Sequence, residues 1–164
     1  MSQQNLAVYL NDHLAGSVGA LGLFDRIRRV SDEDGVARRV REVREAVRED
    51  QQVLEEVRRR LGIRRSRLRN VAASLAQKLS SAKFRLEASK HGEVQLLHAL
   101  DSLSLGIEGK KALWSALEAG AEVNPRLRGL VDHRDLIRRA DEQLATLRDL
   151  RAEAAQRAFS PGEH

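Results

Sequence analysis

A single acidic residue interrupts an otherwise apolar helical pattern. Steps of three and four residues connect eight positions between residues 36 and 61: Val36, Val40, Val43, Val47, Asp50, Leu54, Val57 and Leu61. This spacing places all eight, Asp50 included, on one buried face of a helix. Because a buried carboxylate is strongly disfavoured without a cation, Asp50 needs a partner. The side chains available for that role are Arg48, Lys110, Lys111 and His13.

Positive charge is concentrated in one segment. Residues 64–90 hold eight basic residues and one acidic residue, so their net charge of +7 exceeds the +5 of the whole chain. The segment opens with four closely spaced arginines: Arg64, Arg65, Arg67 and Arg69. Such a cluster can contact nucleic-acid phosphates, and a cationic helix with a narrow apolar face can lie on anionic lipid. Because no aromatic residue is interleaved among the four, a solvated or intersubunit face is the preferred interpretation, with nucleic acid and lipid as alternatives.

The common catalytic and metal-binding patterns are missing from the sequence. The absence of cysteine excludes disulfides, thiolate zinc sites, iron–sulfur clusters and a cysteine nucleophile. There is no glycine-rich phosphate loop, no nucleophile elbow and no His-Glu-x-x-His pattern. His91, His98 and His164 show no pairing at ligand spacing, and His133, next to the expected N-cap of the last helix, is expected to be solvated. These observations favour a protein that is not an enzyme and that holds no cofactor.

The elements that must position these residues are helices. The 164 residues fit a single domain over 1–164, and only two prolines leave room for long uninterrupted helices. Apolar residues at helical spacing predict four long helices about one core. Their expected ranges are 4–30, 36–61, 93–119 and 132–158. A fifth, shorter basic helix is expected near 66–86, and residues 160–164 are expected to fray.

Local signals mark the helix ends. Gly62 predicts the end of the second helix, and Asp132 with Asp135 predicts the start of the last one. Residues 118–125 are expected to form a turn opened by Gly120, in which Asn124-Pro125 caps a short helical turn. Three glycines in the first helix predict the close approach of a neighbouring helix: Gly16, Gly19 and Gly22.

The lengths of the connections predict the topology. The link over residues 62–92 is long enough to travel the length of a bundle, so the third helix can start at the end opposite to the one where the second stops. The predicted fold is therefore all-α, a ferritin-like four-helix bundle with a long crossover that contains the short basic helix. Its helix directions are up, down, down and up, which places Leu117 at the same end as Leu6. The alternative is simple up-down-up-down.

Four stretches carry a family resemblance: residues 5–16, 48–54, 105–114 and 139–144. Together they resemble small bacterial ferritin-like bundle proteins of unassigned function. The resemblance implies a four-helix bundle with a crossover. In active relatives it also implies a di-iron centre built from one Glu on each of two helices and Glu-x-x-His on the other two.

Carried over residue by residue, the resemblance leaves an incomplete ligand set. Asp50 and Asp141 stand where Glu-x-x-His is expected, but Val53 and Leu144 replace the two histidines. Glu108 matches the carboxylate of the third helix. At the matching height of the first helix, where the family has Glu, stand Asp12 and His13. We expect Asp50, Glu108 and Asp141 to converge in the core as an unmetallated remnant, with a metal site or surface exposure as the alternatives.

The functional prediction is a non-catalytic bundle that acts as a scaffold or partner-binding module, through self-association or a protein partner. The alternatives are a carboxylate-based iron or manganese protein, which includes an oxidoreductase, and nucleic-acid binding through the basic crossover. No apolar stretch approaches the roughly 20 residues that span a bilayer, and residues 1–5 have no basic flank leading into a secretion signal. Together with the absence of cysteine, this predicts a cytoplasmic protein.

Overall fold

Four long helices make up most of the chain. The computed structural model describes residues 2–30, 34–64 and 92–161. Its helices are α1 (Ser2–Val30), α2 (Asp34–Arg60), α4 (Gly92–Val123) and α5 (His133–Phe159), and a short 3-10 helix, η2 (Pro125–Leu127), precedes α5. No strand occurs in these three ranges. The prediction of an all-helical chain with four long helices is confirmed, whereas the expected helix near 66–86 falls outside the described residues.

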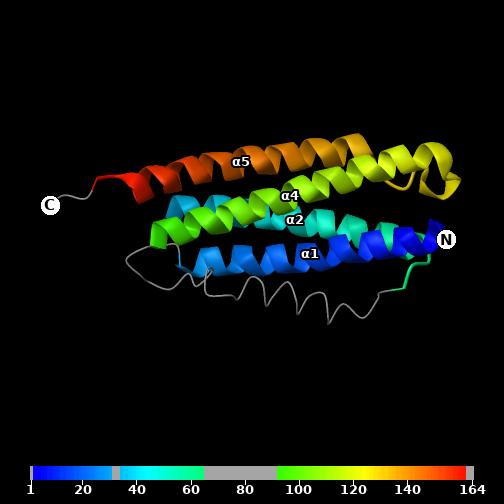
Figure 1. The fold of residues 1–164 in the computed structure, drawn as a ribbon, viewed down its shortest axis with the longest axis horizontal. Coiled ribbons are helices and arrows are strands. Elements are labelled where there is room, and N and C mark those ends of the chain that lie inside the picture. Colours follow the sequence, from blue (N-terminus) through cyan, green and yellow to red (C-terminus); the bar gives the residue numbers. More distant parts are fainter. Residues whose placement is uncertain (1, 31–33, 65–91, 162–164) are drawn as a thin grey trace.

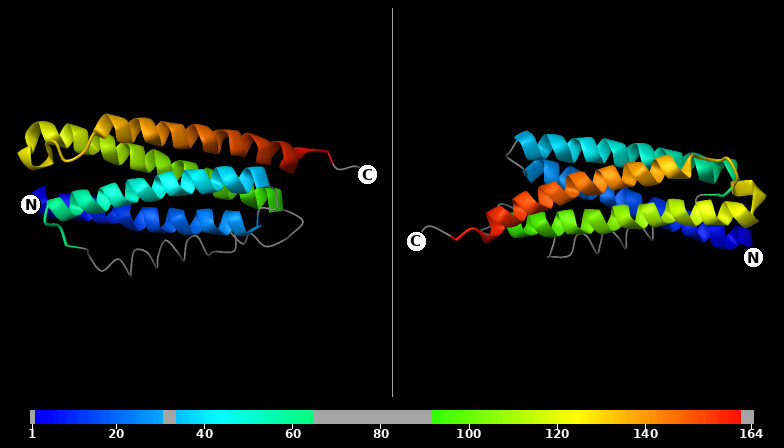
Figure 2. Two further views of the ribbon diagram at one scale, coloured as in Figure 1. Left: turned by 180° about the vertical axis from the view of Figure 1, so that it is seen from behind. Right: turned by 90° about the horizontal axis from the view of Figure 1, so that it is seen from above.

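The helices lie side by side as an elongated bundle (Figures 1 and 2). α1 leads away from the N-terminus and α2 returns, α4 then runs in the same direction as α2, and α5 returns again. α4 packs against α5 and α1, and α2 packs against α1 and α5. α2 therefore ends and α4 begins at opposite ends of the bundle, as the long link predicts. In agreement, Leu6 and Leu117 belong to one apolar cluster.

A polar layer divides the core into two apolar clusters. The first cluster surrounds Phe24, Leu100 and Leu147, and the second surrounds Leu10 and Trp114. Between them stand three polar side chains that face the interior from three helices: Asp50 of α2, Lys110 of α4 and Gln143 of α5. We call these three residues the polar layer.

Backbone geometry ends α2 where the sequence predicts. Gly62 has a φ of +68°, a conformation that residues with a Cβ rarely adopt. Its amide donates to the Arg59 carbonyl at 3.0 Å, and the Ile63 amide donates to the Arg58 carbonyl at 3.0 Å. These two hydrogen bonds satisfy carbonyl groups in the last turn of α2 that have no partner within the helix.

The predicted end of α4 is wrong. The helix passes through Gly120 and continues to Val123, so residues 118–123 are not a turn. Gly120 instead allows a close approach, because a Cβ at this position would lie 3.0 Å from Leu127 Cδ1. The predicted caps are confirmed: Asn124 Oδ1 accepts from the Arg126 amide at 3.1 Å, and Asp132 Oδ1 accepts from the Asp135 amide at 3.0 Å.

Two of the three glycines of α1, Gly16 and Gly22, do not serve the purpose predicted for them. A Cβ at Gly16 or Gly22 would meet nothing within 4 Å, so neither glycine is needed for a close helix contact. Among the described helices, none is long and apolar enough to cross a membrane.

Candidate functional site

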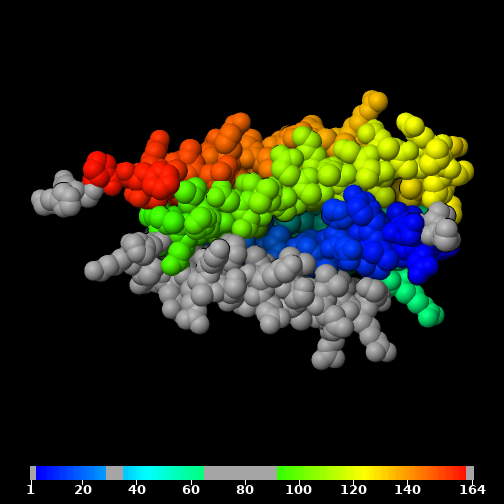
Figure 3. Space-filling model, viewed as in Figure 1, coloured from blue at the N-terminus to red at the C-terminus, as the bar shows by residue number. Residues whose placement is uncertain are grey.

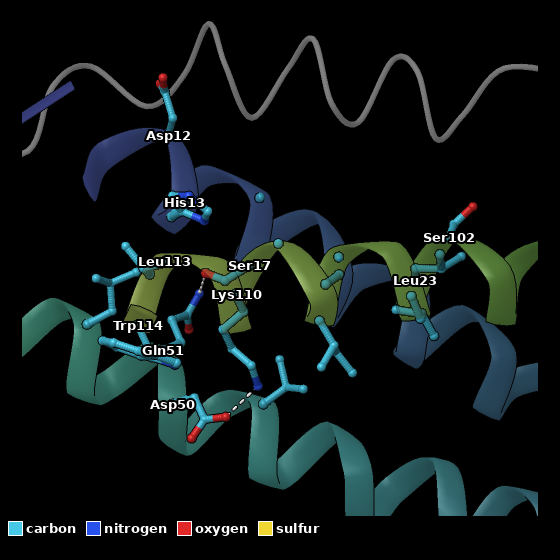
Figure 4. A pocket seen from close by; sticks show the side chains of 18 of the residues that line it. Asp12, His13, Ser17, Leu23, Asp50, Gln51, Ser102, Lys110, Leu113 and Trp114 are labelled. Atoms are coloured by element: carbon cyan, nitrogen blue, oxygen red, sulfur yellow. Dashed lines mark hydrogen bonds and ion pairs between the residues drawn. The ribbon is translucent and has the colours of Figure 1, made fainter. Parts of the chain in front are cut away.

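The centre of the bundle holds a buried ion pair. The Asp50 side chain is fully buried, and its Oδ2 accepts a hydrogen bond from the Lys110 ammonium (Figure 4). Gln143 Nε2 donates to the same oxygen at 2.9 Å. Lys110 also donates to Gln143 Oε1, so each member of the polar layer contacts the other two. The sequence argument that Asp50 needs a cation is correct, and its partner is Lys110.

A second cation reaches Asp50 from the edge of the bundle. An Arg139 guanidinium nitrogen lies 2.9 Å from Asp50 Oδ1 and 2.9 Å from a carboxylate oxygen of Glu49. Arg139 and Asp50 Oδ1 form an ion pair, but their geometry is not that of a hydrogen bond. Because Glu49 is exposed, Arg139 connects the buried carboxylate to the surface.

Burial sets the electrostatics of Lys110. Its side chain is 14% exposed. Desolvation lowers the Lys110 pKa, the Asp50 carboxylate partly opposes this shift, and the nearby Arg139 charge adds to it. The Lys110 ammonium and the Asp50 carboxylate therefore form an ion pair that is largely buried. Such a pair contributes little net stability as a whole, but removal of one partner is costly.

The predicted convergence of three carboxylates is wrong. Glu108 and Asp141 are exposed, and Asp141 Oδ1 accepts from Lys111 Nζ at 2.5 Å on the surface. Glu108 directly follows the buried Ile107, and Asp141 directly follows the buried Ala140. Successive residues point in directions about 100° apart around the helix axis, so both carboxylates point away from the core. Only Asp50 of the predicted core acids therefore faces the interior.

Within the described ranges, no group of three or more His, Asp or Glu side chains is arranged to hold a metal ion. His13 is half-buried on α1, and its ring packs edge-to-face against Tyr9, with ring centres 4.7 Å apart. Burial lowers the His13 pKa below its usual 6.5, and the charge of Asp12 partly opposes this shift.

Of the predicted anion-binding arginines the structure describes Arg64, which is exposed, while Arg65, Arg67 and Arg69 lie outside the described residues.

Sequence reasoning missed Gln143 and Arg139. Gln143 stands three residues after Ala140 and four before Leu147, so it continues the buried steps of α5. That spacing was the available signal, but the apolar neighbours Ile137 and Leu144 suggest a face one residue away, and both side chains are only half-buried. No comparable pattern marks Arg139.

A pocket of about 470 Å³ lies between α1 and α4, and we call it the α1–α4 pocket. Figure 3 shows the face of the molecule on which α4 lies between α5 and α1. The lining runs from Tyr9 to Leu23 along α1 and from Ser102 to Trp114 along α4. α2 contributes four residues: Val47, Asp50, Gln51 and Leu54. The pocket thus reaches the polar layer, with Lys110 extending across it toward Asp50 (Figure 4).

Comparison with models of known protein families, with curated proteins and with solved structures finds no match for this chain.

Proposed function

We propose that this chain is a ferritin-like bundle without catalytic activity that serves as a scaffold or partner-binding module in the cytoplasm. The observation that supports this proposal is the Lys110 ammonium on Asp50. In active members of the family that the sequence resembles, the corresponding layer of carboxylates is expected to bind iron. Here a side chain of the protein itself supplies the positive charge.

The internal cation explains why Asp50 tolerates burial without a metal. A carboxylate inside a protein needs an opposite charge and filled hydrogen-bonding positions. Lys110 and Gln143 supply both at Oδ2, and the Arg139 charge faces Oδ1. A metal ion at Asp50 would have to displace the Lys110 ammonium and would meet no second carboxylate in the polar layer.

Apolar side chains on the surface support a role in binding partners. Val8 and Val18 of α1 are 56% and 46% exposed, and Leu105 of α4 is 74% exposed. Burial of such side chains against another protein or a second copy of the chain is favourable by about 25 cal/mol per Å² of apolar surface. Light scattering across a concentration series distinguishes self-association from a requirement for a different partner.

A thermal scan tests the loss of metal binding. We expect the melting temperature of the purified protein to be the same with and without added Fe(II) or Mn(II). If the protein bound either ion, a hundredfold excess over Kd would stabilise it by about 2.7 kcal/mol. For a chain of this size that corresponds to about 5–11 °C. A rise of this size that disappears in the Asp50→Leu variant would contradict the proposal.

A further inference from the structure

Glycines in the lining leave the α1–α4 pocket unfilled. Gly16 of α1 and Gly106 and Gly109 of α4 all line it, and a Cβ at any of them would meet nothing within 4 Å. The glycines therefore create space between two packed helices, at a cost of roughly 1 kcal/mol each relative to alanine. Its volume of about 470 Å³ falls within the range of small-molecule sites, about 300–1,000 Å³.

The polar side chains of the pocket are concentrated at one end. That end includes Asp12, His13, Ser17, Asp50, Gln51 and Lys110, together with the apolar Leu54, Leu113 and Trp114. Its apolar end includes Ala20, Leu23, Val47, Leu103 and Ile107. In Figure 4, His13, Leu113 and Trp114 lie at one end of the view, and Leu23 and Ser102 lie at the other. The division matches an amphiphilic molecule that has one polar head and an apolar body.

Two hydrogen-bond donors in the lining have no acceptor. An ammonium has three N–H donors, and Lys110 uses two of them on Asp50 and Gln143. Trp114 is completely buried, and its Nε1–H has no partner. Ser17 and Gln51, in contrast, already bond to each other at 2.7 Å. A ligand head that fits this end must therefore supply hydrogen-bond acceptors, and a negative charge suits Lys110 better than a positive one.

The dimensions of the pocket favour an extended body. The steps from Tyr9 to Leu23 along α1 correspond to about 21 Å at 1.5 Å per residue. A lining of that length suits an elongated molecule, such as one with a single hydrocarbon chain.

We propose that the α1–α4 pocket binds an extended-chain carboxylic acid. Its carboxylate lies at Lys110 and Trp114, and its hydrocarbon chain runs toward Leu23 and Leu103. This binding site is independent of the scaffold role, because its lining does not include the exposed apolar side chains Val8, Val18 and Leu105.

Calorimetric titration with three probes tests both the head and the chain. We expect dodecanoate to bind at a stoichiometry of one. Dodecyltrimethylammonium, which has the same chain and a cationic head, and butyrate, which has the same head and a short chain, should each bind at least tenfold more weakly. Equal binding of the two long-chain probes, or no saturable binding of dodecanoate, would overturn the proposal.

Two glycine variants of α1 locate the site. Gly16→Leu places a side chain in the pocket, whereas Gly22→Leu makes the same change on the same helix at an exposed position outside the lining. We expect Gly16→Leu to abolish dodecanoate binding and Gly22→Leu to bind as the wild type does. If Gly16→Leu fails to fold by circular dichroism, Gly109→Leu fills the pocket from α4 instead. If folded Gly16→Leu or Gly109→Leu protein binds dodecanoate as the wild type does, the ligand does not bind in this pocket.

Trp114 provides a further readout, because it is the only tryptophan in the chain. Its fluorescence should change on dodecanoate binding in the wild type. Trp114→Phe keeps an aromatic ring but removes the Nε1 donor, so calorimetry should show an affinity about threefold to tenfold weaker. An unchanged affinity in this variant would refute the placement of the carboxylate.

Discussion

Replacement of Lys110 by methionine should destabilise the bundle far more than the same replacement of its neighbour Lys111. The two lysines are adjacent in α4, yet Lys110 bonds to the fully buried Asp50, while Lys111 bonds to Asp141, whose side chain is 52% exposed. Lys110→Met leaves the Asp50 carboxylate in the core without its ammonium. Lys111→Met merely releases an acid to water.

The size of the difference follows from burial. Removal of one partner of a buried ion pair costs about 3–5 kcal/mol, whereas an exposed pair contributes about 1 kcal/mol or less. Arg139 stays 2.9 Å from Asp50 Oδ1 and compensates in part, so we expect about 3 kcal/mol for Lys110→Met. At about 2–4 °C per kcal/mol for a chain of this size, the melting temperature should fall by about 6–12 °C.

A combined variant separates the cost of a broken pair from the value of the whole polar layer. Replacement of Asp50 and Lys110 together would strand Gln143, because its amide bonds to both. The informative variant is therefore Asp50→Leu with Lys110→Met and Gln143→Leu, which removes the entire layer. It should be as stable as the wild type or more stable by about 1–4 kcal/mol, since desolvation of the charges no longer opposes folding.

Urea denaturation monitored by circular dichroism measures all of these variants. The linear extrapolation gives the free energy of unfolding, and the slope reports whether the variants unfold from a similarly compact state. If Lys110→Met and Lys111→Met lose the same free energy, the ion pair at the centre of the bundle is not buried as described. If the triple variant is the least stable of the set, the polar layer contributes net stability and the desolvation argument fails.

Two further predictions concern single side chains of α2 and α5. Hydrogen bonds from Arg59 and Arg60 lower the Glu56 pKa from 4.5 to about 2. The stability that this carboxylate contributes is therefore present above pH 4.5 and is lost as the pH falls from 4.5 to about 2. Glu56→Gln should flatten that part of the melting-temperature profile, and an unchanged slope would contradict the assignment. Asp132→Ala should cost about 1 kcal/mol, because it leaves the Asp135 amide uncapped. Asp149→Ala, at an exposed position within α5, is its control, and similar losses from both would argue against the cap.

The sequence predicts the helices well because each long helix has a continuous apolar face. The regular stripe from Val36 to Leu61 identifies α2 almost to the residue, and Asp132 marks the start of α5. The end of α4 is different, since Gly120 ordinarily indicates a break. Its role depends on Leu127, a residue brought close by the chain reversal through η2, and local sequence contains no information about that contact.

The candidate site is predictable only in part, because it depends on helix rotation. Asp50 is identified correctly since apolar residues surround it in both directions along the stripe. Glu108 and Asp141 each sit next to a buried residue, and an error of one position along a helix turns a side chain by about 100°. Lys110 was one of four candidate cations, and the choice among them requires α2, α4 and α5 to be placed in register.

The polar layer and the α1–α4 pocket have opposite effects on the bundle. Asp50, Lys110 and Gln143 bond to one another only when α2, α4 and α5 have one longitudinal register, so a shift of any of the three helices breaks buried hydrogen bonds. α1 contributes no member to this layer and faces α4 across glycines instead. The carboxylic acid that we propose would therefore bind at the interface between α1 and α4, which no hydrogen bond of the polar layer crosses.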